Sequence, residues 1–325
     1  MNRERLRPHY PYDPFGSLST LAKPLRVSQE TLLAISQAPR SYYRRIPIER
    51  KGKVRETWDA LPPLKSIQAR IQCLVLREVK YPRYLQGGIR DEEQARDFVS
   101  NASLHCGRRL VICEDIKDFF PSTSSDLIYD LWCSLFHFPD HIARVLTGLT
   151  TLEGYLPQGA KTSSYLANLA LWRTEPQLVE SLSRQGFTYS RYVDDITLST
   201  DRRLTGSEIA KVVRQVARMC SRSGFRLKRS KHSLTTSGNR MSATGLMVNR
   251  RASLPKEVRS QTRALVHQCE SRANTSKEMR QTPDFAAEWN RASGKVALLQ
   301  RLHPTEGNPL RRRLRAIKPV SDQTA

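Results

Sequence analysis

Residues 191–199 read Arg191-Tyr192-Val193-Asp194-Asp195-Ile196-Thr197-Leu198-Ser199, and they set two adjacent carboxylates between two runs of strand-forming residues. Tyr, Val, Ile, Leu and Thr favour a half-buried strand, so we expect a β-hairpin with both acids at or beside its turn. Two ionised carboxylates this close repel each other and need a counter-charge. Three explanations are open: a solvated turn, a salt bridge to one of the many arginines, or a divalent metal site with a third acid.

A second acid-bearing strand supplies that third carboxylate. Residues 110–113 (Leu-Val-Ile-Cys) predict a short buried strand, and Asp115 follows close behind it. Open sheets place ligand chemistry at such strand ends, so neighbouring strands would bring Asp115, Asp194 and Asp195 together. Carboxylates are hard oxygen ligands suited to Mg²⁺, and two such ions can stabilise the attacking and leaving oxygens of an in-line phosphoryl displacement. The acids therefore predict nucleotidyl transfer.

The charge of the chain points to a polyanionic partner. Its 325 residues include 54 Lys and Arg against 31 Asp and Glu, a formal net charge of +23. Nucleic acid is the first expectation and an anionic membrane surface the second. No apolar run approaches the roughly 18 to 20 residues that span a bilayer, and the N-terminus lacks the apolar core of a signal peptide, so we expect a cytoplasmic protein. Six scattered cysteines without a CxxC pair argue against disulfides and a zinc site.

Coarse patterning predicts an α+β fold, with helices on one face of an antiparallel sheet. The middle of the chain reads strand, helix, helix, hairpin, helix, strand. Ser28 and Ser207 are candidate N-caps, and Phe225 with Leu227 suggests a strand after the turn at Gly224. Residues 250–325 hold 16 Lys and Arg against 7 Asp and Glu and predict basic helices separated by prolines.

Several motifs together resemble those of retron reverse transcriptases. Residues 192–195 resemble their Tyr-x-Asp-Asp box, residues 115–120 their first Asp-containing motif, and residues 156–163 their Leu-Pro-Gln-Gly-x-x-x-Ser motif. Residues 101–105 match the retron Asn-Ala-x-x-His motif, and residues 243–245 resemble its Val-Thr-Gly motif. The resemblance covers about residues 28–303.

The resemblance implies a right-hand polymerase fold: an N-terminal arm (1–26), fingers (27–109), an antiparallel-sheet palm covered by helices (110–249) and a small helical thumb (250–325). It implies that the metal ligands are Asp115, the Ile116 carbonyl, Asp194 and Asp195, holding two Mg²⁺ ions for which Mn²⁺ can substitute. The nucleotide-binding residues it implies are Lys53, Arg55, Phe120, Gln158, Gly159 and Lys231. The RNA-binding residues it implies are Asn101, His105, Thr244, Gly245, Arg311, Arg312 and Arg313.

The function implied is that of a bacterial RNA-directed DNA polymerase. It would bind its cognate non-coding RNA, prime from an internal 2′-hydroxyl, and use dNTPs to make the RNA-linked DNA called msDNA. The family also implies anti-phage defence with an effector protein. Val193, Ala243 and Lys161 depart from the usual family residues, but none replaces a carboxylate, so we expect an active enzyme. Two alternatives stay open: another bacterial reverse transcriptase (group II intron-like or defence-associated), and a non-catalytic RNA-binding subunit.

Overall fold

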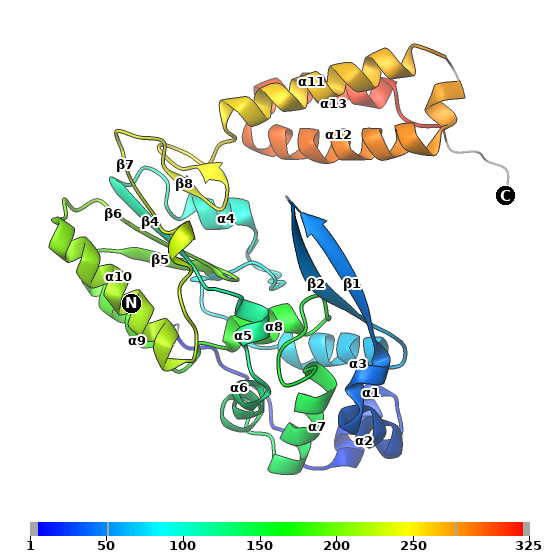
Figure 1. Ribbon diagram of the computed structural model, residues 1–325, viewed down its shortest axis with the longest axis vertical. Coiled ribbons are helices and arrows are strands. Elements are labelled where there is room, and N and C mark those ends of the chain that lie inside the picture. Colours follow the sequence, from blue (N-terminus) through cyan, green and yellow to red (C-terminus); the bar gives the residue numbers. More distant parts are fainter. Residues whose placement is uncertain (1–5, 51, 277, 321–325) are drawn as a thin grey trace.

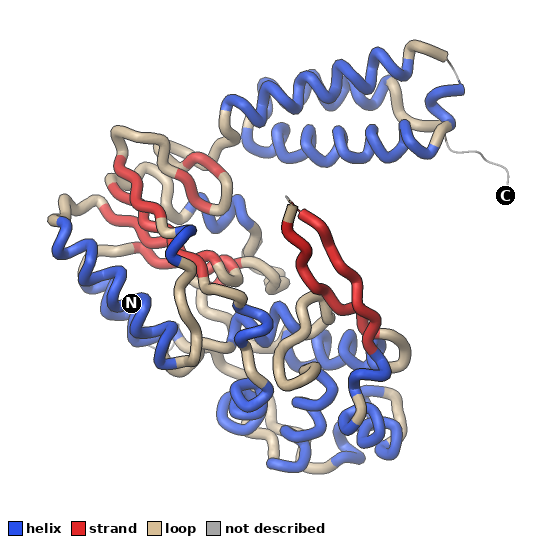
Figure 2. The backbone as a smooth tube through the Cα atoms, in the orientation of Figure 1, coloured by secondary structure: helices blue, strands red, loops and turns tan. Residues whose placement is uncertain are grey.

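The computed structural model describes residues 6–50, 52–276 and 278–320 (Figure 1). Its helices and strands fall into a helical N-terminal part that carries a long hairpin, a central sheet with helices against it, and a C-terminal bundle of helices (Figure 2). The mixture of helix and sheet agrees with the predicted α+β class. No helix in the described ranges is long and apolar enough to cross a membrane.

The N-terminal part packs short capped helices beneath the hairpin. Ser28 caps α2 by accepting a hydrogen bond from the Thr31 amide, as predicted. The π turn Gln72–Leu76 directly continues α3, so residues 64–76 form one continuous helical segment. The elements here are α1 (Leu18–Leu25), α2 (Gln29–Gln37), the 3₁₀ turn Pro39–Tyr42, β1 (Tyr43–Arg50), β2 (Lys53–Ala60) and α3 (Leu64–Ile71).

The central sheet has the strand order β3-β5-β6-β4-β7. Its strands are β3 (Leu85–Gln86), β4 (Leu110–Asp115), β5 (Thr188–Tyr192), β6 (Asp195–Thr200) and β7 (Ser233–Thr236). All neighbours are antiparallel except β3 and β5, which are parallel. Helices α9 (Glu175–Arg184) and α10 (Gly206–Arg222) lie along one side of this sheet (Figure 1).

Two details of the sequence prediction are wrong. The cap of α10 is Thr205 rather than Ser207, because Thr205 forms a reciprocal capping box with Glu208. Phe225 is buried in the core, and Leu227 contributes only an isolated bridge to Ile116 instead of a strand. The edge strand is the polar segment Ser233–Thr236.

Short helices connect the sheet to the rest of the molecule. They are α4 (Phe98–Ser103), α5 (Phe119–Ser122), α6 (Ser125–Asp130), the π turn Leu131–Leu135, α7 (Asp140–Thr150) and α8 (Ser163–Leu169). The 3₁₀ turn Arg229–Lys231 precedes β7, and the small hairpin β8 (Ser242–Ala243) and β9 (Leu246–Met247) follows it.

The C-terminal bundle consists of α11 (Lys256–Ala273), the 3₁₀ turn Glu278–Gln281, α12 (Pro283–Leu302) and α13 (Pro304–Ala316). Val266, Phe285 and Val296 are fully buried at its centre. The same apolar cluster continues through Met241 and Val99, and thereby attaches the bundle to the β8–β9 hairpin and α4.

Candidate active site

The hairpin predicted at residues 191–199 is formed by β5 and β6, joined by a two-residue turn at Val193 and Asp194. Val193 has a φ of +59°, a conformation that β-branched residues rarely adopt and that two-residue hairpin turns normally give to glycine. Strain of this kind persists only where surrounding contacts hold it, and it concentrates at functional sites.

The three acids meet at one edge of the sheet because β6 and β4 are neighbours, as expected. Asp115 ends β4 directly opposite Asp195, the first residue of β6. The Ile116 amide donates a hydrogen bond of 2.9 Å to the Asp194 carbonyl, which ties the end of β4 to the turn. The side chain of Asp115 is almost completely buried, while Asp195 keeps nearly half of its side-chain surface exposed.

These carboxylates carry more negative charge than the chain itself neutralises. Burial, and then the charge of Asp115, raise the pKa of Asp194. Burial, and then the charge of Asp194, raise the pKa of Asp195 to about 7. The ammonium of Lys231 is hydrogen-bonded to Asp115 and lies 3.8 Å from an Asp195 oxygen, so it contacts two of the three acids.

The donor set fits a divalent cation by its chemistry. Carboxylate oxygens are the ligands that Mg²⁺ prefers, and a surplus of negative charge favours its binding. Among the described residues, no three His, Cys, Asp or Glu side chains are already arranged around a common metal position. Lys231 contacts the carboxylate that a metal would need, so the ammonium and an ion compete for Asp115.

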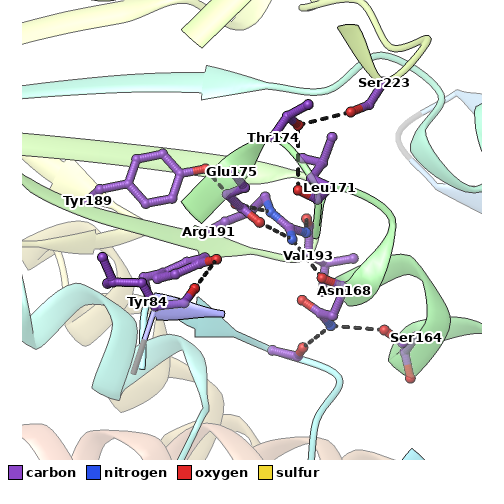
Figure 3. A network of polar contacts seen from close by, with 12 residues as sticks. Tyr84, Ser164, Asn168, Leu171, Thr174, Glu175, Tyr189, Arg191, Val193 and Ser223 are labelled. Carbon is purple, nitrogen blue, oxygen red and sulfur yellow. Dashed lines mark hydrogen bonds and ion pairs between the residues drawn. The ribbon is translucent and has the colours of Figure 1, made fainter. Parts of the chain in front are cut away.

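A buried ionic network fixes the turn from behind (Figure 3). The fully buried guanidinium of Arg191 donates to Glu175 at 2.6 and 2.8 Å, to the Val193 carbonyl at 2.9 Å and to the Asn168 carbonyl at 2.8 Å. The Tyr189 hydroxyl donates to the same Glu175 at 2.7 Å. Arg191 therefore joins α8, α9 and the turn. Sequence reasoning did not single out this residue, although an arginine within a strand of otherwise buried residues is a signal that could have found it.

Comparison with known proteins identifies the family. Residues 62–276, more than half of the chain, match the family model described as "Reverse transcriptase (RNA-dependent DNA polymerase)". The retron Se72 reverse transcriptase of Salmonella heidelberg is 33% identical over 322 residues, which cover 97% of this chain and 83% of that protein. The chain belongs to the retron reverse transcriptases. It is an RNA-directed DNA polymerase.

Other relatives agree. The retron Ec48 reverse transcriptase of Escherichia coli is 28% identical over 319 residues, covering 94% of this chain and 77% of that protein. The retron Mx65 reverse transcriptase of Myxococcus xanthus is 30% identical over 284 residues, covering 82% and 62%.

The residues expected to contact the nucleotide lie on two segments that dock on each other. The amide of Trp58 on β2 donates to the Gln158 carbonyl at 2.8 Å. Gly159 has a φ of +109°, and a Cβ there would lie 2.8 Å from the Trp58 carbonyl oxygen, so this contact requires glycine. The hairpin of this reverse transcriptase thus rests on the 156–163 loop through backbone contacts.

Of the remaining nucleotide candidates, Arg55 and Lys231 act on the acids directly. Arg55 is exposed on β2, and its charge lowers the pKa of Asp194, an effect smaller than the burial and repulsion that raise it. Phe120 is half-buried at the start of α5, five residues beyond Asp115. Lys231 lies against Asp115, as described above. The side chain of Lys53 falls outside the described residues.

Two of the RNA-binding predictions need correction. Asn101 and His105 are fully buried, so the structure contradicts direct contact between their side chains and RNA. The two ring nitrogens of His105 form hydrogen bonds of 2.8 and 2.7 Å with the hydroxyls of Ser199 and Ser190, linking β6 to β5. Burial accordingly lowers the pKa of His105 to about 3. Its place in the enzyme is structural.

The other RNA candidates lie nearer the surface. The Thr244 hydroxyl donates to the Phe98 carbonyl at 2.8 Å, next to the exposed Gly245. In α13, Arg311 donates to the Ser293 hydroxyl, Arg313 forms a two-bond ion pair with Glu270, and Arg312 is exposed.

Proposed function

We propose that this reverse transcriptase binds its own structured RNA and copies part of it into msDNA, starting from a 2′-hydroxyl inside that RNA. The observation that carries the catalytic part of the proposal is the pairing of Asp115 with Asp195 beside the strained turn that bears Asp194. The family to which the chain belongs carries the part that concerns the RNA and the product.

In this proposal Asp115, Asp194, Asp195 and the Ile116 carbonyl hold two Mg²⁺ ions, with Mn²⁺ as a substitute. When bound, the ions lower the pKa of the primer hydroxyl and neutralise charge on the leaving pyrophosphate. The chain's own groups position the reactants: the Arg191 network keeps the turn in its strained conformation, and the Ile116–Asp194 hydrogen bond keeps β4 in register with it.

The nucleotide pocket in this proposal lies between the β1–β2 hairpin and the acids. Arg55, Lys53 and Lys231 supply positive charge for the triphosphate, while Gln158 and Gly159 lie against the incoming nucleotide. The ring of Phe120 takes the space that a 2′-hydroxyl would need and so selects deoxynucleotides.

We further propose the domain organisation of a right-hand polymerase, with an N-terminal arm (1–26), fingers (27–109), a palm (110–249) and a thumb (250–325). Surface residues Thr244, Gly245, Arg311, Arg312 and Arg313 would contact the RNA. The RNA–DNA product would hold an effector protein in check during defence against phage.

The nucleic acid that copurifies with the enzyme tests this function. Expressed from its native bacterial locus, the enzyme should copurify with single-stranded DNA joined to RNA through a 2′–5′ linkage. Ribonuclease should leave the DNA with a short ribonucleotide remnant, and a debranching enzyme should remove that remnant. Recovery of RNA alone, or of DNA with a free 5′ end, would contradict the proposed priming.

A further inference from the structure

Helix α10 carries a line of cations on the side that faces away from the sheet. Lys211, Arg214, Arg218 and Arg222 are all exposed, whereas Val212, Val216 and Met219 are buried. At 100° per residue the four cations lie within an arc of about 80°, opposite the residues that pack on the sheet. We call these four residues the α10 stripe.

The α10 stripe is not neutralised by the protein. No ion pair joins any of its members to an acidic side chain within the described residues, and Glu208, the acid of α10, is bound to Thr205 and Arg202. Five arginines of the C-terminal part, by contrast, are ion-paired. Arg259 and Arg263 share Glu306, Arg272 pairs with Glu288, Arg301 with Asp97, and Arg313 with Glu270. The stripe therefore keeps its charge available for an external partner.

The surroundings of the stripe indicate what kind of partner fits. Protein interfaces bury an apolar or aromatic centre, and membrane-bound helices insert apolar side chains. Sites for single-stranded nucleic acid present aromatic rings for base stacking. The large hydrophobic side chains exposed in the described chain include none between residues 200 and 230. The face instead adds the exposed hydroxyls of Ser207 and Ser221, which suit phosphate oxygens.

We propose that the α10 stripe binds the phosphate backbone of a double-stranded segment of the enzyme's RNA. The stripe is about 16 Å long at 1.5 Å per residue. A DNA duplex presents about ten phosphate charges over that length, at one per 1.7 Å, and the shorter rise of an A-form RNA duplex gives at least as many. Three of the four cations are arginines, whose planar guanidinium groups bind phosphates through two hydrogen bonds. The proposal rests on the proposed function in that the enzyme holds a folded RNA, but the site is separate from the carboxylates.

A charge-removal variant of the full-length enzyme tests the proposal. It combines Lys211→Gln, Arg214→Gln, Arg218→Gln and Arg222→Gln, because glutamine keeps a comparable helix propensity. The matched control removes the same number of exposed cations elsewhere: Lys23→Gln, Arg26→Gln, Arg144→Gln and Arg173→Gln. Thermal unfolding is measured first, to check that both variants fold. The probe is a blunt 20-base-pair RNA duplex, whose affinity is measured between 50 and 200 mM salt.

Each lost phosphate contact should reduce the slope of log affinity against log salt by about 0.9, so the stripe variant should lose about 3 to 4 units of slope. Between 50 and 200 mM salt, the wild type should therefore lose on the order of 100-fold more affinity than the stripe variant does. The slope of the control variant should stay close to that of the wild type. Equal slopes in the two variants would overturn the proposal. A loss seen only with a DNA duplex would overturn the assignment to RNA. A stripe variant that keeps its RNA slope but no longer binds poly-L-glutamate would assign the stripe to an acidic protein.

Primer extension on a short preformed primer–template hybrid separates this inference from the proposed function. The stripe variant should extend such a hybrid at the wild-type rate. If the wild type does not extend the hybrid, the proposed function is refuted, but the result on duplex binding remains valid.

Discussion

Replacing Glu175 with glutamine removes the counter-charge of Arg191 while leaving nearly the same shape. Arg191 is fully buried and Glu175 is almost so, so the variant leaves a guanidinium charge in the interior without an anion. Breaking a buried pair from one side costs about 3 to 5 kcal/mol. That is a large part of the 5 to 15 kcal/mol by which a typical protein is stable. Urea unfolding of Glu175→Gln should show a loss of this size.

Loss of stability alone would not show that the network positions the turn. A second variant combines Arg191→Met, Glu175→Leu and Tyr189→Phe and replaces the ionic network by apolar groups of similar volume. Such exchanges are often neutral for stability, so the apolar variant should recover most of the loss. It cannot restore the hydrogen bond to the Val193 carbonyl. Because misplacement by 1 Å can cost about 100-fold in rate, its kcat should stay about 100-fold low or lower.

Primer extension with purified enzyme measures kcat and the KM for dNTPs separately. Gln68→Met is the matched control, because Gln68 is fully buried and hydrogen-bonded to the Tyr43 hydroxyl and the Leu149 carbonyl, away from the turn. It should lose stability while keeping its kcat. A stable apolar variant with wild-type kcat would refute the positioning role of Arg191, and an unchanged stability of Glu175→Gln would refute the buried ion pair.

Three further predictions concern single residues. Burial holds the pKa of His105 at about 3, against 6.5 in the unfolded chain, so the unfolded state gains a proton first and stability should fall below pH 6.5 by about 1.4 kcal/mol per pH unit. Urea unfolding at pH 7 and pH 5 should show that His105→Gln removes this pH dependence. The same pH dependence in the wild type and in the variant would contradict the prediction. Phe120→Val should raise ribonucleotide incorporation relative to deoxynucleotide incorporation about tenfold or more in primer extension, whereas an unchanged ratio would exclude the ring as the selector. Gly159→Ala should lower the free energy of unfolding by more than about 1 kcal/mol and slow primer extension, because Gly159 has a φ of +109° and lies against the Trp58 carbonyl. In the control Gly294→Ala, a helical glycine with open space at its Cβ position within the described structure, the free energy of unfolding should rise by about 0.5 to 1 kcal/mol.

The sequence was sufficient for the features that depend on local pattern. Strand-forming residues around Asp194 and Asp195 predicted the hairpin, and the apolar run before Asp115 predicted β4. The acids could meet only if the two strands were neighbours, and the register of β4 against β6 meets this condition. Ser28 was correctly predicted as a cap because it lies just before the apolar residues of α2.

Features that depend on tertiary packing could not be read from the sequence. The cap of α10 is different, because Thr205-x-x-Glu208 is itself a capping-box pattern, and the choice of Ser207 missed this local signal. Phe225 and Leu227 look like a strand, but the core takes Phe225 and leaves no continuous pairing. The motif resemblance implied that Asn101 and His105 bind RNA, whereas both side chains are fully buried and His105 bonds to Ser199 and Ser190 on the sheet. Motif resemblance alone does not distinguish a residue that touches RNA from one that supports the sheet beneath it.

The central claim, that the acids at the β5–β6 turn and the end of β4 carry out nucleotidyl transfer, is tested most directly by primer extension. The variant is Asp194→Asn with Asp195→Asn, assayed with Mg²⁺, dNTPs and an RNA template, and the control is Asp201→Asn, an exposed acid paired with Arg108. We expect the double variant to make no DNA while binding the RNA as the wild type does, and the control to extend normally. DNA synthesis by the double variant would contradict the assignment of these carboxylates.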